Sequence, residues 1–193
     1  FQLPVTSSPR WVPSSQSGGI RKQSMIDDDV FFERNPGLDL STISEVNAIL
    51  QAPFTEDEIA RLSKYLDTTT VSSLKNAGPR IADLPRSYVS LLARSNGGGI
   101  AIGERELAYF DPQSLRDFLV DYQFPIYMPK ALPFGLNGGG VFYVFDMREP
   151  LDNAADYPIL AAHAGNLSFD DSPVVALTLE QLLSDARNIE DLM

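Results

Sequence analysis

Residues 84–99 read LPRSYVSLLARSNGGG, and this stretch describes one helix with both its start and its stop. Leu84-Pro85 opens it, because a proline at the first helical position leaves no amide unpaired and its φ is already helical. Apolar side chains follow at helical spacing, namely Tyr88, Leu91 and Leu92. Asn96 and the glycines after it end the helix, since one of Gly97 and Gly98 supplies the positive φ needed after the last turn and the other tolerates alanine. The stretch predicts an amphipathic helix with one buried face.

Three further helices are predicted on either side of this one. Thr55 and Glu58 form a capping box, in which the Thr55 hydroxyl binds the Glu58 amide and the carboxylate returns the bond, so residues 56–66 are helical. Asp111-Pro112 combines a capping side chain with a proline and opens the next helix. Thr178 with Gln181 opens the last one. The predicted core joins the apolar faces of these helices to a central strand: Leu84, Tyr88, Leu91, Leu92, Phe118, Phe142, Val144, Leu179 and Leu183.

The predicted strands lie between and after these helices. Residues 100–110 form one or two short strands, and residues 141–147 are apolar enough to form a central strand that is covered on both faces. Residues 158–162 and 174–177 supply two more. Because strands and helices do not alternate strictly, the sequence predicts an α+β fold with a mixed, mostly antiparallel sheet and helices packed on one side of it.

The first forty residues differ in composition from the rest of the 193-residue chain. Ser, Pro, Gly and Gln dominate residues 6–24, and a run of three aspartates follows. We therefore expect residues 1–40 to be an extended arm that lays Trp11, Phe31 and Phe32 on the domain, or else to be partly disordered. Residues 41–193 are expected to form one domain.

Composition restricts the class of partner. The formal net charge of −11 disfavours binding to nucleic acid or to anionic membranes, and no apolar run reaches the ~18–20 residues of a membrane helix. The acidity fits a docking face for a basic partner, such as a toxin or nuclease, but taken alone it favours a protein that is kept soluble by its charge. The absence of cysteine excludes disulfides and thiolate zinc sites, and it agrees with a cytoplasmic location.

Catalytic motifs are missing from the sequence. His163 is the only histidine, no Gly-x-Ser-x-Gly elbow occurs, and a transition metal would find almost no nitrogen or sulfur ligands. The text Asn-Gly-Gly-Gly occurs at 96–99 and at 137–140, but each precedes a strand, which is the opposite of a phosphate-binding loop. We therefore predict no catalytic residues, no cofactor and no metal site.

An aromatic loop at residues 122–129 is the strongest candidate for a binding surface. Aromatic residues and methionine are enriched at protein interfaces, although the loop could equally fold back over the sheet and complete the core. The predicted anchors are Phe124, Tyr127 and Met128. The predicted steering carboxylates are those without an evident capping role, namely Asp152, Asp156, Asp170 and Asp171.

In their order and spacing these motifs resemble the SUKH superfamily, which contains a fungal regulator of cell-wall synthesis and many bacterial immunity proteins of toxin systems. The resemblance covers roughly residues 54–185, and 84–98 is its most distinctive stretch. The positions that match family motifs, all with expected structural roles, are Leu84, Pro85, Asn96, Gly97, Gly135, Gly140 and Asp146. One position departs, because members often carry an Asp where this chain has Val141.

The resemblance implies a six-stranded or similar mixed sheet with flanking helices and no catalytic apparatus. It also implies function through protein binding, most often the neutralisation of a co-encoded toxin. The leading hypothesis is therefore an immunity-type protein that occludes a toxin. The alternative is a regulatory or scaffold protein of the cell-wall-regulator type, which recruits partners through the domain and its N-terminal arm.

Overall fold

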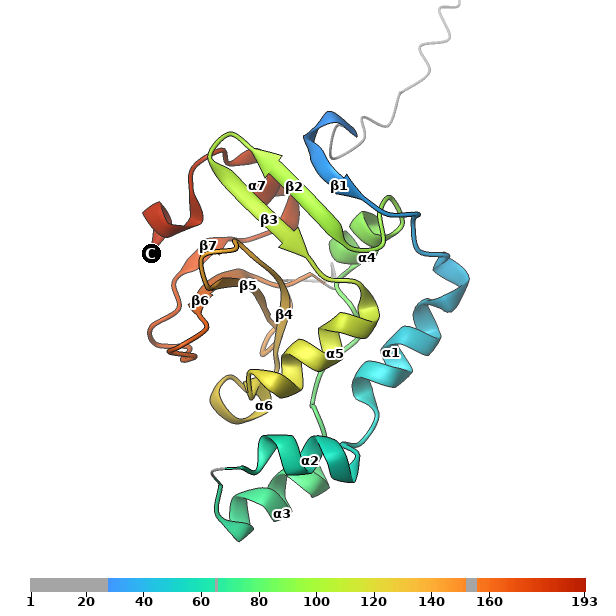
Figure 1. Ribbon diagram of the computed structural model, residues 1–193, viewed down its shortest axis with the longest axis vertical. Coiled ribbons are helices and arrows are strands. Elements are labelled where there is room, and N and C mark those ends of the chain that lie inside the picture. The colour runs from blue at the N-terminus through green and yellow to red at the C-terminus, as the bar shows by residue number, and fades with distance from the viewer. Residues whose placement is uncertain (1–27, 65, 152–155) are drawn as a thin grey trace, which may run out of the picture.

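The computed structural model describes residues 28–64, 66–151 and 156–193, and its centre is an antiparallel sheet (Figure 1). Each strand pairs with its neighbour in chain order, so the described sheet is a meander of seven strands. The strands are β1 (Phe31–Arg34), β2 (Gly98–Ile102), β3 (Arg105–Tyr109), β4 (Ala131–Leu136), β5 (Val141–Asp146), β6 (Ile159–His163) and β7 (Val174–Ala176). The α+β class is confirmed, and every described pairing is antiparallel where the sequence suggested a mixed sheet.

Seven α-helices accompany the described sheet. They are α1 (Ile43–Gln51), α2 (Glu56–Leu62), α3 (Thr68–Ala77), α4 (Arg86–Leu92), α5 (Pro112–Asp121), α6 (Phe124–Tyr127) and α7 (Leu179–Ser184). The four helices expected from their caps are α2, α4, α5 and α7, whereas α1, α3 and α6 were not predicted. Pro85 occupies the position before the first helical residue of α4, one place earlier than expected. The prediction of an arm over residues 1–40 stays a prediction; Trp11 lies outside the described residues, and within 28–40 the strand β1 pairs with β2.

Helices lie against both faces of the central strands. Phe142 makes edge-to-face ring contacts with Phe118 of α5 and Phe124 of α6, whereas Phe145 makes one with Tyr88 of α4. Because successive side chains of a strand alternate between faces, these contacts lie on opposite sides of β5. The expectation that helices pack on one side only was therefore wrong, since β5 is apolar on both faces and needs cover on both.

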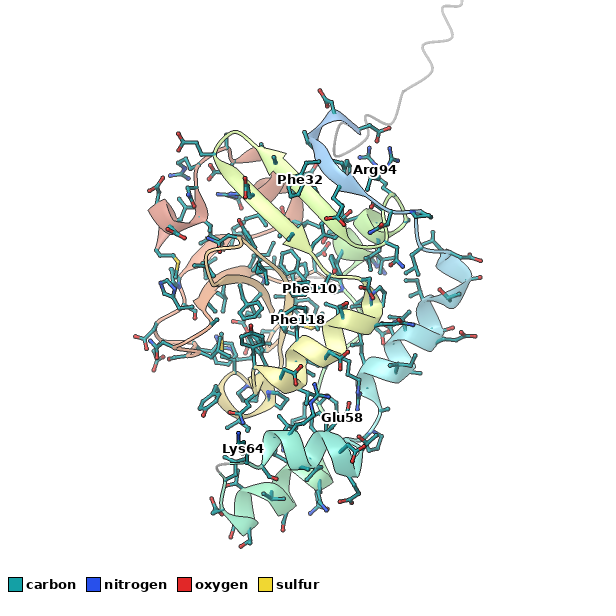
Figure 2. All side chains as sticks on the ribbon, viewed as in Figure 1. Phe32, Glu58, Lys64, Arg94, Phe110 and Phe118 are labelled. Atoms are coloured by element: carbon teal, nitrogen blue, oxygen red, sulfur yellow. The ribbon has the colours of Figure 1, made fainter. Side chains whose placement is uncertain are left out.

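The predicted core is confirmed. Eight of the nine predicted side chains are buried in the main cluster, and Phe118 packs against it half-buried. Phe118 stacks on Phe110 with ring centroids 3.9 Å apart, at the end of β3 (Figure 2). A second, smaller cluster of Ile59, Leu62, Leu74 and Val120 fixes the α2–α3 pair to the side of α5.

The turn between α4 and β2 is held by close backbone contacts. The Ser95 hydroxyl donates to the Gly97 carbonyl and accepts the amide of Asn35. Gly97 and Gly98 both have positive φ, at 76° and 135°. A Cβ on Gly98 would stand 2.5 Å from the Glu33 carbonyl oxygen of β1. The expectation that one of the two glycines tolerates alanine was wrong, because both are in the left-handed region and both face backbone.

Gly98→Ala is expected to lower the free energy of unfolding by about 1–3 kcal/mol, because it adds strain at a positive φ and pushes β1 away from β2. Urea unfolding measures the change. Gly140→Ala is the matched control, since Gly140 also has a positive φ of 92° but a Cβ there would meet no atom within 4 Å. Equal losses in the two variants would show that the contact with β1 contributes nothing.

Candidate protein-binding surface

The aromatic loop is built by α5, α6 and the residues on either side of α6. Asp111 caps α5 through the amides of Gln113 and Ser114, and Pro112 occupies its first turn. Within α6, Phe124 points inward and is fully buried, while Tyr127 points outward with 53% of its surface exposed. Met128 follows and is fully buried. The loop therefore contributes Phe124 and Met128 to the core and Tyr127 to the surface.

Two left-handed residues bracket α6. Gln123 before it has φ 58° and Lys130 after it has φ 69°, values that are uncommon for residues other than glycine. The Gln123 side-chain amide donates to the Leu62 carbonyl at 3.2 Å, which helps to hold this backbone in place. Such strain persists only where surrounding contacts impose it, and it is frequent at binding sites. Here the imposed backbone fixes the outward direction of Tyr127.

A hollow of about 380 Å³ opens beside Tyr127, and we call it the tyrosine hollow. Its lining is Asp121, Tyr122, Gln123 and Tyr127 on one side and residues 164–167 on the other. Tyr122 rests edge-on against the buried ring of Phe142, with ring centroids 4.7 Å apart, and keeps part of its surface exposed. The result is two exposed tyrosines on a rigid aromatic base, which suits contact with another protein.

The loop after β6 forms the opposite wall of the tyrosine hollow. The Ala164 amide donates to the Gly140 carbonyl, and the Asn166 amide donates to the His163 carbonyl. The Asn166 side chain donates to a carboxylate oxygen of Asp171 at 3.3 Å. These bonds connect one of the predicted carboxylates to the wall of the hollow.

The structure separates the other predicted site residues. Phe124 and Met128 were predicted as partner-binding anchors, and this is corrected, because both side chains are fully buried in the main core. Asp156 has a capping role after all, since it accepts hydrogen bonds from the amide and hydroxyl of Ser87 in the first turn of α4. Asp170 is exposed in the loop that also holds Asp171, and Asp152 lies outside the described residues.

Several positions that match the family motifs are buried or in close contact with backbone atoms. Leu84 and Pro85 are buried at the start of α4, and the Leu84 amide donates to the Asn47 side chain at 3.0 Å. Gly135 lies at a bulge of β4, where a Cβ would stand 2.7 Å from the Ala108 carbonyl oxygen. Val141, the departure from the family pattern, is fully buried.

The other motif positions lie in turns or at a strand end. Asn96 and Gly97 form the turn after α4, and Gly140 ends the turn before β5 with its positive φ. Asp146 ends β5 and accepts three hydrogen bonds from Arg148, one from its amide and two from its guanidinium. Burial raises the pKa of Asp146, but the bonds from Arg148 outweigh burial, so the pKa falls below its usual value.

None of the described helices has the length and apolar character needed to cross a membrane. Among the described residues, no group of three or more His, Cys, Asp or Glu side chains is placed to hold a metal ion. His163, the one histidine, is exposed at the end of β6.

Comparison with known proteins identifies the family of this chain. The model of the SMI1 / KNR4 family (SUKH-1) matches residues 53–185, which is more than half of the chain and extends from just before α2 to just after α7. The curated proteins contain no match. The matched region includes every element that lines the tyrosine hollow, whereas β1 and α1 precede it. This chain therefore belongs to the SMI1 / KNR4 family (SUKH-1), as its motifs suggested.

Proposed function

We propose that this chain is a non-enzymatic, cytoplasmic protein-binding domain of the immunity type, which neutralises a partner toxin by covering it with the tyrosine hollow. The observation that carries the proposal is the outward Tyr127, held by a helix whose other aromatic residue is buried. Exposed tyrosines on a rigid base are typical of the residues that supply most binding energy at interfaces. Family membership supports the coarser statement, a domain of the immunity or regulator type.

Charge supports a basic partner. Asp170 and Asp171 are exposed in the loop that forms the opposite wall of the tyrosine hollow. The net charge of −11 attracts a basic protein from a distance, and complementary charge raises association rates by about 10–10³-fold. The carboxylates would thus set the rate of encounter, while Tyr122 and Tyr127 would hold the complex.

A second candidate function is a regulatory or scaffold protein that recruits partners through the domain and its N-terminal arm. The observation in its favour is β1, which joins the sheet although it precedes the region matched by the family. Phe32 of β1 lies over Gly99 with 61% of its surface exposed. A segment attached in this way could present the arm to other proteins.

Tyr127→Ala is expected to weaken binding of the partner by on the order of 2 kcal/mol, which is about thirtyfold in Kd. The partner is first captured from the native host at low salt, and association and dissociation rates are then measured with the purified proteins. The loss should appear in the dissociation rate, because a central anchor acts after encounter. Thermal unfolding should remain nearly unchanged, since the Tyr127 ring is more than half exposed.

Phe32→Ala is the matched control, because it removes an equally exposed aromatic ring from the edge of the sheet. An immunity function requires that co-expression of this chain protects cells from the captured partner. A partner that is bound but not toxic would support the regulatory function instead. If Tyr127→Ala leaves the dissociation rate unchanged, the tyrosine hollow is not the binding surface.

A further inference from the structure

A second and larger hollow lies at the other end of α5. It has a volume of about 690 Å³ and is formed by the segment 35–39, by α1 and by the first turn of α5. We call it the α1–α5 hollow. In Figure 1, α1 approaches α5 near the end of β3, on the side away from α6. Most of the residues that line the α1–α5 hollow precede residue 53, so they lie outside the region that the family model matches.

The lining of the α1–α5 hollow combines an apolar wall with acidic groups. Val46 and Ile49 of α1 lie on one side, and Ile49 is 54% exposed. Three carboxylates join them, from Asp39, Glu45 and Asp111, and the described lining contains no Lys, Arg or His. A ligand with an apolar stem and a cationic head satisfies both parts of such a surface, which is the character of an arginine side chain.

Two carboxylates of this hollow, Asp39 and Asp111, have pKa values below the usual one. The Ser41 amide lowers the pKa of Asp39 by hydrogen bonding. Burial raises the pKa of Asp111, but hydrogen bonds from Ser114 and Gln113 outweigh burial and lower it. Glu45 is an exposed acid in the first turn of α1, and no side-chain hydrogen bond or ion pair joins it to another described residue.

The wall also contains an acceptor that has no donor. The side-chain Oδ1 of Asn96 is buried, and no hydrogen-bond donor reaches it from the described part of the chain. Leaving a buried acceptor without a donor is unfavourable, and a ligand rich in N–H groups that reached this atom would satisfy it. Arginine carries five such donors. The uncharged part of the lining therefore favours the same ligand as the charged part.

One face of α5 connects the two hollows. Gln113 lines the α1–α5 hollow, Asp121 lines the tyrosine hollow, and Asp117 is exposed midway between them. Positions four residues apart share a helix face, and eight residues of helix span about 12 Å. A single partner could therefore occupy both hollows at once.

We propose that the α1–α5 hollow binds an arginine side chain presented by a basic segment of the protein partner. The stem would lie on Val46 and Ile49, and the guanidinium would pair with Glu45 and Asp39. This inference rests on the proposed function, because it assigns the second subsite to the same partner. The docking face of this chain would then run along α5 with one hollow at each end.

The first test uses a defined probe instead of the partner. N-acetyl-arginine-methylamide is titrated into the full chain, and backbone amide shifts are followed by NMR. Shifts are expected at Val46, Ile49 and Asn96, and they should diminish as salt is raised. The citrulline analogue has the same stem without the charge and should bind at least tenfold more weakly. Equal binding of the two probes, or shifts spread over the whole surface, would overturn the proposal.

The second test compares variants of the α1–α5 hollow with matched control variants, for binding of both the arginine probe and the captured partner. Glu45→Arg should weaken both the arginine probe and the captured partner by about tenfold or more, because it places a like charge in the hollow. Glu180→Arg is the control, since Glu180 is likewise an exposed acid in the first turn of a helix, α7, and should change either affinity less than twofold. Ile49→Ser tests the apolar wall against Val174→Ser, a similarly exposed residue of β7.

The remaining outcomes separate the two proposals. If Tyr127→Ala weakens the partner and Glu45→Arg does not, the second subsite is wrong and the proposed function stands. If the arginine probe binds the hollow but neither Tyr127→Ala nor Glu45→Arg affects the partner, both proposals fail. If the double variant Arg21→Ala/Lys22→Ala shifts the amides of the hollow in the absence of probe, the occupant is the chain's own N-terminal segment, which also overturns the proposal.

Discussion

Arg116→Met is expected to lower the free energy of unfolding by about 3–5 kcal/mol, the usual loss when one member of a buried ion pair is removed. The guanidinium of Arg116 is bidentate to Glu58, with Nε–Oε1 at 2.6 Å and Nη2–Oε2 at 2.8 Å. It also donates to the carbonyls of residues 49 and 50 in the last turn of α1 and to those of residues 52 and 53 just after it. One side chain of α5 therefore supplies hydrogen-bond donors to the carbonyls at the end of α1 and to Glu58 in the first turn of α2. Glu58 also completes the capping box of α2.

The same variant should change the dependence of stability on pH. Hydrogen bonding by Arg116 lowers the pKa of Glu58 from 4.5 to about 2. A lowered folded-state pKa means that the carboxylate stabilises the fold above its ordinary pKa and loses this contribution as pH falls through the folded value. The native chain should lose stability between about pH 4.5 and 2 in part through this group, and Arg116→Met should flatten that decline.

Arg61→Met is the matched control, because Arg61 also bridges α2 to α5 but does so at the surface. Its side chain is 41% exposed and pairs with Asp117 and Asp121. Exposed pairs contribute about 0–1 kcal/mol, so the expected loss is under about 1 kcal/mol. Urea unfolding at pH 7 and at pH 3 measures both variants. Similar losses for the two would mean that burial of the Arg116–Glu58 pair (Figure 2 labels Glu58) has no energetic effect.

Arg105→Met is expected to cost a comparable 3–5 kcal/mol and to loosen the end of the chain. Arg105 of β3 is almost fully buried, and it donates to the carbonyls of Leu182 and Arg187 at 2.7 and 3.0 Å. Both acceptors belong to α7 or to the segment after it, so the guanidinium closes the C-terminal end of α7 and ties it to the sheet. A methionine would fill the space but remove the donor of the Arg187 carbonyl and leave the Leu182 carbonyl with the Asp185 amide alone.

The measurement pairs urea unfolding with hydrogen exchange at the amides of α7, which should exchange faster in Arg105→Met than in the native chain. Arg187→Met is the control, because Arg187 binds Asp185 from the solvent side with 67% of its side chain exposed. It should cost less than about 1 kcal/mol. Unchanged exchange in α7 would show that Arg105 stabilises the sheet alone and not the terminal segment.

Local signals predicted much of this fold because they act over a few residues. The capping box of α2 forms as expected, with the Glu58 amide on the Thr55 hydroxyl and the carboxylate on the Thr55 amide. The missed elements carry conflicting local signals. Helix α3 is rich in Thr and Ser, which have low helix propensity, and it is held by the Asp67 cap and by packing on α2. Strand β4 contains Pro133 and a bulge at Gly135, and because proline and glycine are typical of turns the sequence did not indicate a strand here.

The binding surface depended on packing that short-range pattern does not contain. Nothing in the spacing of Phe124, Tyr127 and Met128 says which ring turns inward, because α6 has barely one turn and its orientation follows from the core beneath it. Asp156 seemed free of a capping role because the helix it caps lies 69 positions earlier in the chain. The α1–α5 hollow combines segments from 35–49, 96 and 111–113, so the sequence alone carried no trace of it.

The meander order of the sheet has a consequence for how the chain assembles. From β2 onward each strand pairs with the next one along the chain, so most of the sheet can grow by closing short loops. Strand β1 is the exception, because it reaches β2 across about sixty intervening residues, as does the bond from Asn35 to Ser95. Contacts of such long sequence separation form late in folding, and an edge strand opens with little disturbance to its neighbours. Strand β1 is thus the part of the described sheet that we expect to close last and to open first.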